Sequence, residues 1–196
     1  MKYQNNVTKI KVVFLDFDGV INDYLTFNSV NDENVRILKR IIDETGAKVV
    51  VTSSNKYFFQ REKARKKIED TRIYTTYIKK LNERGIEIFG FTPLVDEDRE
   101  HEILEYLNLH PEVEQYLILD DDYIIKQCMN HEIYLDLQSG LREKHLIPAI
   151  KILNGELNFY HDCNEAQLNE GIEERVERMN EIIDKLEKNN GEEIER

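Results

Sequence analysis

Cysteines and long apolar runs are scarce in this sequence of 196 residues, and their scarcity excludes several classes of protein. The two cysteines, Cys128 and Cys163, match neither a disulfide framework nor the spacing of a metal-binding motif, so we expect a reducing, cytoplasmic setting. No apolar run approaches the roughly 18 residues that a membrane-spanning helix requires, so we expect no membrane partner. Residues 1–11 are polar and lack the apolar stretch of a signal peptide.

Positive charge is also scarce, because the formal net charge is −12. This balance argues against a general affinity for nucleic acids. Residues 55–80 are the exception, since nine Lys or Arg residues stand there against three acidic residues, with Tyr57, Phe58, Phe59, Tyr74 and Tyr77 among them. The basic residues are Lys56, Arg61, Lys63, Arg65, Lys66, Lys67, Arg72, Lys79 and Lys80. This basic segment either holds a phosphate backbone and stacks bases, or forms a solvated helix whose aromatic residues belong to the core.

Short apolar runs alternate with amphipathic stretches along most of the chain. We expect strands at residues 11–15, 48–51, 86–91, 116–119 and 133–137. We expect helices between Asn31 and Gly46, over most of 57–84, and at 98–109, 141–153 and 165–188. The alternation predicts an α/β fold, a Rossmann-like three-layer sandwich around a parallel sheet of about five strands. Residues 1–153 would form this domain, and residues 154–196 a helical appendage.

Two of the expected strands end in acidic residues. Asp16 and Asp18 follow the first strand, and Asp120 and Asp121 follow the strand at residues 116–119. Ligands bind at the carboxyl ends of parallel strands, so both clusters would share one crevice. Crowded carboxylates repel one another unless a cation lies among them, and oxygen ligands without nearby His or Cys favour Mg²⁺. One carboxylate could then attack phosphorus and form an aspartyl-phosphate.

Two further features fit a phosphate site at these strand ends. Gly19 permits a sharp turn directly after the acids, and the hydroxyls of residues 52–54, which follow another strand, can donate to phosphoryl oxygens. Each of the three strand ends alone has a simpler explanation. Residues 16–19 could be a solvated turn, residues 120–122 an acidic helix start, and the hydroxyls of residues 52–54 a helix cap. Their combination at three strand ends favours a functional site.

The same residues carry a resemblance. Residues 12–20, 52–53 and 116–121 resemble, in chain order, the first, second and fourth motifs of the haloacid dehalogenase-like (HAD) superfamily. Residues 18–22, 45–54 and 119–122, with the later 139–141, are similar to the HAD domain of bacterial RNA-repair proteins. The resemblance covers about residues 10–153. It departs after the serines, where Asn55 and Lys56 stand in place of a Trp-Arg pair.

The resemblance implies a Mg²⁺-dependent phosphomonoester hydrolase of HAD-like fold. Asp16 would be the nucleophile and a metal ligand. Asp18 would be the general acid and then the base, and its main-chain carbonyl would bind the metal. Asp120 would ligate Mg²⁺, and Asp121 would bind the ion or its water.

The remaining roles that the resemblance implies are less narrowly placed. Ser53 or Thr52 would be the second-motif hydroxyl. Arg99, at the start of a helix, would supply the cation that stabilises the phosphoryl oxygens, with Lys56 and Lys126 as alternatives. The expected substrate contacts are Gly19, Ser54 and Lys56.

Too few residues separate the first and second motifs to hold a helical cap, which is typical of the capless members of the superfamily. An uncovered site tends to admit macromolecular ends, so a nucleic-acid end or a nucleotide is the expected phosphorylated substrate. A small-molecule phosphatase and a non-catalytic module that binds metal and phosphate remain as alternatives.

The last expected helix has an apolar stripe formed by Leu168, Ile172, Val176, Met179, Ile183 and Leu186. It would pack on the domain or form a coiled-coil seam, so the chain would be a monomer or a dimer. The five histidines form no cluster and are expected at the surface.

Overall fold

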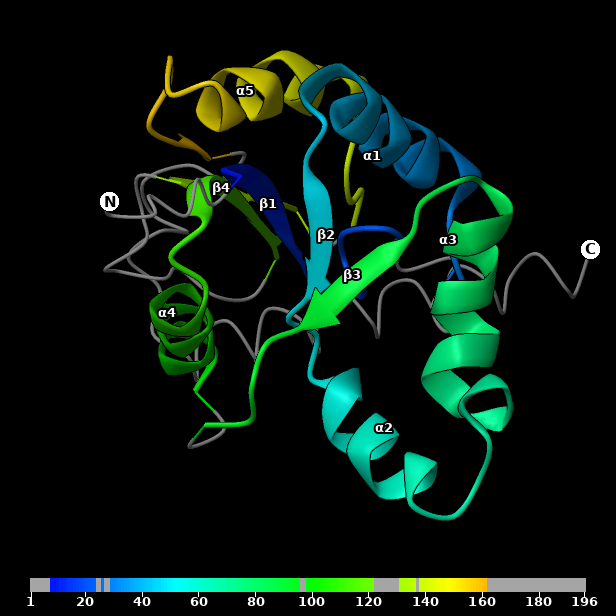
Figure 1. Ribbon diagram of the computed structural model, residues 1–196. Helices are drawn as coiled ribbons and strands as arrows, with labels where there is room; N and C mark the ends of the chain where they lie inside the picture. The colour runs from blue at the N-terminus through cyan, green and yellow to red at the C-terminus, as the bar shows by residue number, and fades with distance from the viewer. Residues whose placement is uncertain are drawn as a thin grey trace, which may run out of the picture. The chain divides into compact units, whose positions relative to one another are not determined.

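The computed structural model describes residues 8–23, 26, 29–95, 98–121, 131–136 and 138–161. In this part of the chain a six-stranded sheet has the order β3-β2-β1-β4-β5-β6, and all neighbouring strands are parallel (Figure 1). The strands are β1 (Ile10–Leu15), β2 (Lys48–Val51), β3 (Ile88–Phe91), β4 (Val113–Asp120), β5 (Glu132–Tyr134) and β6 (Tyr160–His161). The five expected strands are confirmed, and the short β6 adds a sixth that pairs with β5.

Helices cover both faces of the sheet, as the alternating pattern predicts. Successive side chains of a strand point to opposite faces. In β1, Val13 and Leu15 join the larger core cluster, while Val12 and Phe14 join the smaller one. The larger cluster contains residues of α1 (Asp32–Thr45) and α5 (Glu143–Leu153), and the smaller one residues of α4 (Arg99–Leu109). The three-layer α/β sandwich is thus confirmed.

The first helix begins and ends where the sequence predicts. The Asn31 side chain caps α1 by accepting hydrogen bonds from the backbone N–H groups of Glu33 and Asn34. Gly46 ends the helix in the left-handed region, with φ of 69°. These two signals fix where the chain turns between β1 and β2.

The expected helical stretch at residues 57–84 is broken into shorter pieces. It consists of α2 (Asn55–Lys63), the 3₁₀ turn η2 (Ile68–Asp70), the π-helix η3 (Tyr74–Ile78) and α3 (Lys79–Glu83). No residue from 61 to 70 is buried. A single helix would need a continuous apolar stripe against the core, and this run does not provide one. The stripe resumes with Ile73, Tyr77, Ile78 and Leu81.

The predicted helix at 165–188 lies outside the described residues, as do Lys126, Cys128, Cys163 and Leu137. Among the helices that are described, none has the length and the apolar character needed to cross a membrane.

Candidate active site

The functional groups gather where four adjacent strands end. Asp16 follows β1, Thr52 follows β2, Thr92 follows β3, and Asp120 is the last residue of β4. Backbone hydrogen bonds continue the sheet by one residue at this edge. The N–H of Asp16 donates to the Leu119 carbonyl at 3.1 Å, and the N–H of Thr52 donates to the Leu15 carbonyl at 2.9 Å. The prediction that the acids and hydroxyls share one edge is confirmed.

Three carboxylates form a compact group at this edge. Asp16, Asp120 and Asp121 each offer an oxygen atom, and these atoms lie within 4.8 Å of one another. Asp16 and Asp120 are buried. Burial raises the pKa of Asp16 to about 7; Arg99 opposes the shift, while Asp120 and Asp18 add to it. Burial and mutual repulsion make this grouping of carboxylates unfavourable unless a small divalent cation binds their oxygens. A donor set made of oxygen atoms fits Mg²⁺.

Arg99 reaches the acids from the first turn of α4. Asp98 caps this helix by accepting from the backbone N–H of His101 at 3.1 Å. Arg99 is buried, its Nη1 lies 3.3 Å from Asp16 Oδ1, and it pairs with Asp120. Its Nη2 also lies 3.4 Å from the Ser54 hydroxyl. The predicted cation therefore lies against the predicted nucleophile.

Asp18 is surrounded by hydrogen-bond donors from three parts of the chain. Asn22 Nδ2 donates to Asp18 Oδ1 at 2.8 Å, the Tyr77 hydroxyl donates to the same oxygen at 2.9 Å, and Asn55 Nδ2 donates to Oδ2 at 3.1 Å. No sequence pattern assigns these three residues to Asp18, because two of the contacts join segments that are far apart in the chain.

Gly19 allows the loop after β1 to approach the loop after β4. Its φ is 69°, and a Cβ atom there would lie 2.2 Å from Asp121 Oδ2. Any side chain would therefore displace Asp121 from the acidic group as well as strain the backbone. Gly19 contributes space rather than a functional group.

Comparison with known proteins agrees with this geometry. Residues 12–146 match the family described as the HAD domain in Swiss Army Knife RNA repair proteins. The chain belongs to this family. No curated protein matches the sequence. The match contains all the strand ends that carry the acids, and the family suggests a hydrolase. The acidic edge formed by these strand ends is called the HAD site below.

The two hydroxyls of the second HAD motif differ in their partners. The Ser53 hydroxyl forms a hydrogen bond with the Asp16 carboxylate, and this contact opposes the rise in the pKa of Asp16. Thr52 Oγ1 is buried and has no hydrogen-bond partner among the described residues. The geometry therefore favours Ser53 as the hydroxyl that faces the reacting group. Ser54 is exposed beside it.

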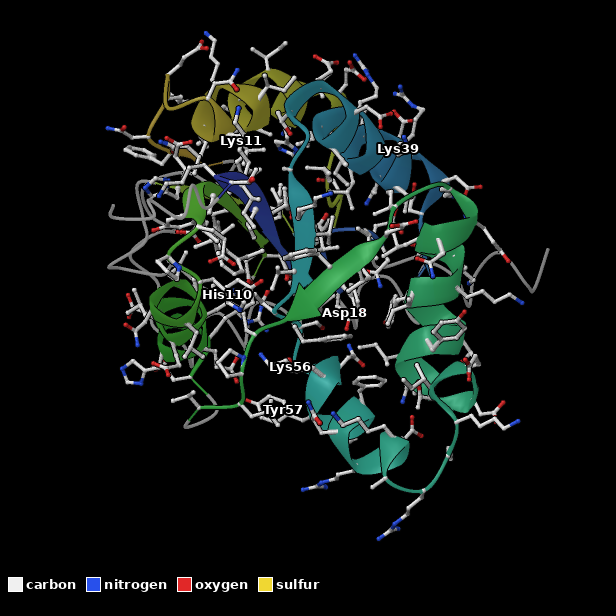
Figure 2. The ribbon with its side chains drawn as sticks, in the orientation of Figure 1. Lys11, Asp18, Lys39, Lys56, Tyr57 and His110 are labelled. Atoms are coloured by element: carbon white, nitrogen blue, oxygen red, sulfur yellow. The ribbon has the colours of Figure 1, made fainter. Side chains whose placement is uncertain are left out.

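Lys56 lies beneath the HAD site rather than in it. Its Nζ is buried and donates to the Thr52 carbonyl at 3.2 Å, to Thr92 Oγ1 at 2.7 Å and to Glu102. The Tyr57 hydroxyl donates to the other oxygen of Glu102 at 2.7 Å. Figure 2 shows Lys56 and Tyr57 at the start of α2, near the carboxyl end of β3. This cluster connects the carboxyl ends of β2 and β3 to the first turn of α4.

We expect Lys56→Met to lower the free energy of unfolding by about 3–5 kcal/mol, because it leaves the buried Glu102 carboxylate without its cation. Urea denaturation would measure the change. Lys79→Met is the matched control, since Lys79 is exposed and 4.0 Å from Glu83, and it should change stability by less than about 0.5 kcal/mol. Equal effects of the two substitutions would contradict the account of Lys56.

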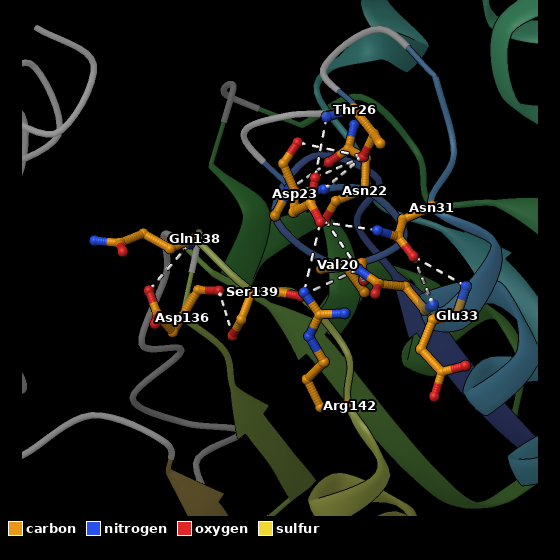
Figure 3. A network of polar contacts seen from close by, with 12 residues as sticks. Val20, Asn22, Asp23, Thr26, Asn31, Glu33, Asp136, Gln138, Ser139 and Arg142 are labelled. Atoms are coloured by element: carbon orange, nitrogen blue, oxygen red, sulfur yellow. Dashed lines mark hydrogen bonds and ion pairs between the residues drawn. The ribbon is translucent and has the colours of Figure 1, made fainter. Parts of the chain in front are cut away.

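A second polar network fixes the loop that follows Asp18 (Figure 3). Asp23 accepts from Asn31 Nδ2 at 2.8 Å and from the Thr26 hydroxyl at 2.9 Å, and Arg142 Nη2 lies 3.5 Å from it. Asn34 Nδ2 donates to the carbonyls of Val20 and Asn22, each at 3.1 Å. These contacts hold the loop against α1 and the start of α5, and so keep Asn22 in reach of Asp18.

The basic segment begins at the HAD site and then turns outward. Its first residue, Asn55, contacts Asp18. Its aromatic residues divide between core and surface. Phe59 is buried and stacks on Phe91 at 5.0 Å, whereas the side chain of Phe58 is 60% exposed. Most of its cations are exposed, namely Arg61, Lys63, Arg65, Lys66, Lys67, Arg72 and Lys79.

Proposed function

We propose that this HAD domain is a Mg²⁺-dependent phosphomonoester hydrolase that acts through an aspartyl-phosphate on Asp16. One observation carries the proposal. Asp16 is buried at a strand end, with Arg99 Nη1 3.3 Å from its Oδ1 and oxygens of Asp120 and Asp121 within 4.8 Å. A guanidinium that touches the attacking carboxylate can also bind the oxygens of the phosphoryl group under attack.

The metal would be held by carboxylate oxygens of Asp16, Asp120 and Asp121 and by the main-chain carbonyl of Asp18. When bound, Mg²⁺ would screen the phosphate from the carboxylates and polarise a phosphoryl oxygen. The raised pKa of Asp16 supports this proposal, because an ion among the acids would favour the charged nucleophile.

The chain's own residues would carry the two chemical steps. An Asp16 oxygen attacks phosphorus, the bond from phosphorus to the leaving alcohol breaks, and Asp18 gives its proton to that oxygen. Asp18 then takes a proton from water, whose oxygen attacks phosphorus. The bond from phosphorus to Asp16 breaks and inorganic phosphate leaves.

The phosphoryl oxygens would be bound by Arg99 and the Ser53 hydroxyl, with Gly19 and Ser54 lining the site. The buried contacts of Lys56 Nζ favour Arg99 over Lys56 as the phosphate-binding cation.

The proposed substrate is a phosphorylated nucleic-acid end or a nucleotide. The RNA-repair description of the family and the exposed cations after Asn55 support this choice. A screen with Mg²⁺ would cover 5′- and 3′-phosphorylated oligonucleotides, nucleotides, sugar phosphates and p-nitrophenyl phosphate. Preference for sugar phosphates would indicate a small-molecule phosphatase. No turnover of any of them would contradict the proposal and favour a non-catalytic module.

The exposed cations should make oligonucleotide turnover depend on salt. We expect kcat/KM for a phosphorylated oligonucleotide to fall steeply between low and moderate salt, and that for p-nitrophenyl phosphate to change little. Replacing Lys63, Arg65 and Lys67 with Glu should reduce the slope of log kcat/KM against log salt by roughly 2, since each contact to a single strand contributes about 0.7. Lys66 is kept because it pairs with Glu62 at 3.0 Å.

The matched control carries the same change of charge at another surface, with Glu at Lys9, Lys48 and Lys151, all exposed. Lys48 begins β2, at the amino ends of the strands. If both triple variants change the slope equally, or if the two substrates respond alike, the basic segment is only a solvated surface and the nucleic-acid substrate should be abandoned.

A further inference from the structure

Tyr77 brings a distant part of the chain to the Asp18 carboxylate. It lies in the π-helix η3 (Tyr74–Ile78), and it is 2% exposed. Its ring stacks on Phe17, with centroids 4.5 Å apart and planes at 25°. Phe17 directly precedes Asp18, so the stacking holds the ring close to this part of the loop.

The hydroxyl of Tyr77 is directed at Asp18 by this packing. It donates to Asp18 Oδ1 at 2.9 Å.

The other two donors to Asp18 come from the loops that also form the rest of the site. Asn22 donates its amide N–H to Asp18 and accepts from the Gly19 N–H at 2.8 Å, so it also shapes the loop. Asn55 also contacts the Ser53 hydroxyl at 3.3 Å. Tyr77 differs from both, because its hydroxyl makes no other described contact and can be removed while the ring stays on Phe17.

We propose that Tyr77 is a positioning residue that fixes the direction of the Asp18 carboxyl group for proton transfer. This inference rests on the proposed function, in which Asp18 gives its proton to the leaving oxygen. The hydroxyl and Asn22 Nδ2 together hold Oδ1, and Asn55 holds Oδ2, so the carboxyl plane has one orientation. Without the hydroxyl, Oδ1 keeps one donor instead of two, so the plane is held less firmly and fewer encounters place the proton on the leaving oxygen.

The test compares two substrates of nearly the same shape, phenyl phosphate and p-nitrophenyl phosphate, with Tyr77→Phe. Phenolate is the stronger base, so its departure depends more on the proton from Asp18. We compare kcat/KM, because it reports only the steps up to departure of the alcohol and not the hydrolysis step that both substrates share. We expect kcat/KM for phenyl phosphate to fall by roughly 10- to 100-fold, a part of the 10²–10⁴ that a general acid supplies, and that for p-nitrophenyl phosphate to fall by less than about threefold. In an Asp18→Asn background, the same substitution should change either rate by less than about twofold.

Tyr74→Phe is the matched control, because it removes a hydroxyl from the same π-helix with no described contact to the site, and both rates should be unchanged. A melting temperature close to that of the wild type would show that the Phe17 contact is retained. Equal losses for the two substrates, no loss for either, or an undiminished effect in the Asp18→Asn background would overturn the positioning role while leaving the phosphatase intact. No turnover by the wild-type chain would overturn the proposed function, and the role of Tyr77 with it.

Discussion

Replacing Asp16 with Asn is expected to reduce phosphatase turnover below about one per cent of the wild-type rate, because an amide cannot serve as the covalent nucleophile. The change is nearly isosteric, and it leaves Arg99 paired with Asp120. Turnover of p-nitrophenyl phosphate with saturating Mg²⁺ measures the loss. Activity well above that level would show that another group attacks phosphorus.

Stability measurements separate this loss from unfolding. The pKa of Asp16 is higher in the folded protein, about 7, than the roughly 3.9 of an unfolded chain. Its ionisation therefore lowers the stability of the metal-free fold as pH rises from about 4 to about 7. Asn lacks this cost, so metal-free Asp16→Asn should melt at or above the wild-type temperature at pH 8, and show no such gain near pH 4. A lower melting temperature at pH 8 would contradict this account of the acidic group.

Removing divalent cations should lower turnover by at least about a hundredfold, because the metal's stabilisation of the transition state amounts to several kcal/mol. The acids would otherwise repel the phosphate dianion. Chelator treatment followed by titration with Mg²⁺ would measure the loss and its recovery. Full activity in chelator would exclude the proposed metal role.

Binding of the ion can be measured without turnover. At a Mg²⁺ concentration of 100 times its Kd, the fold should gain about 2.7 kcal/mol, visible as a rise in melting temperature. Asp120→Asn should lose most of this rise, because it removes one of the three grouped carboxylates. Asp43→Asn is the matched control, since Asp43 pairs with Lys39 on the exposed surface of α1, and it should keep the rise. Equal rises in both variants would place the ion elsewhere.

The strand ends were predictable from the sequence because the signals there are local. Short apolar runs rich in β-branched residues, such as residues 48–51, favour buried strands, and parallel strands bring their carboxyl ends to one edge. That rule is sufficient to predict that Asp16, Asp120 and the hydroxyls lie together. For Arg99 the prediction rests on the resemblance, which implies a cation before the fourth motif, and Arg99 fits this role at the start of a helix. The two-residue β6 has no such signal, because its hydrogen bonds depend on β5 being in place.

The surroundings of the acids were not predictable, because they depend on packing between distant segments. In the sequence, Tyr77 is one position of an apolar stripe with Ile73 and Leu81, so the pattern predicts a core residue. In the structure it lies in a π-helix and its hydroxyl donates to Asp18. Lys56 reads as one cation among nine, yet its Nζ is buried against Glu102. Composition describes the segment correctly as basic, but it cannot tell which cation faces inward.

The central claim, a phosphoryl group covalently held by Asp16, can be tested by trapping it. Protein turning over p-nitrophenyl phosphate with Mg²⁺ would be quenched in acid, treated with borohydride, which reduces an acyl phosphate to an alcohol, and digested for mass spectrometry. The account predicts that residue 16 is converted from aspartate to homoserine, and only when substrate and metal are both present. Continued turnover with unmodified Asp16, or conversion of a different residue, would contradict it.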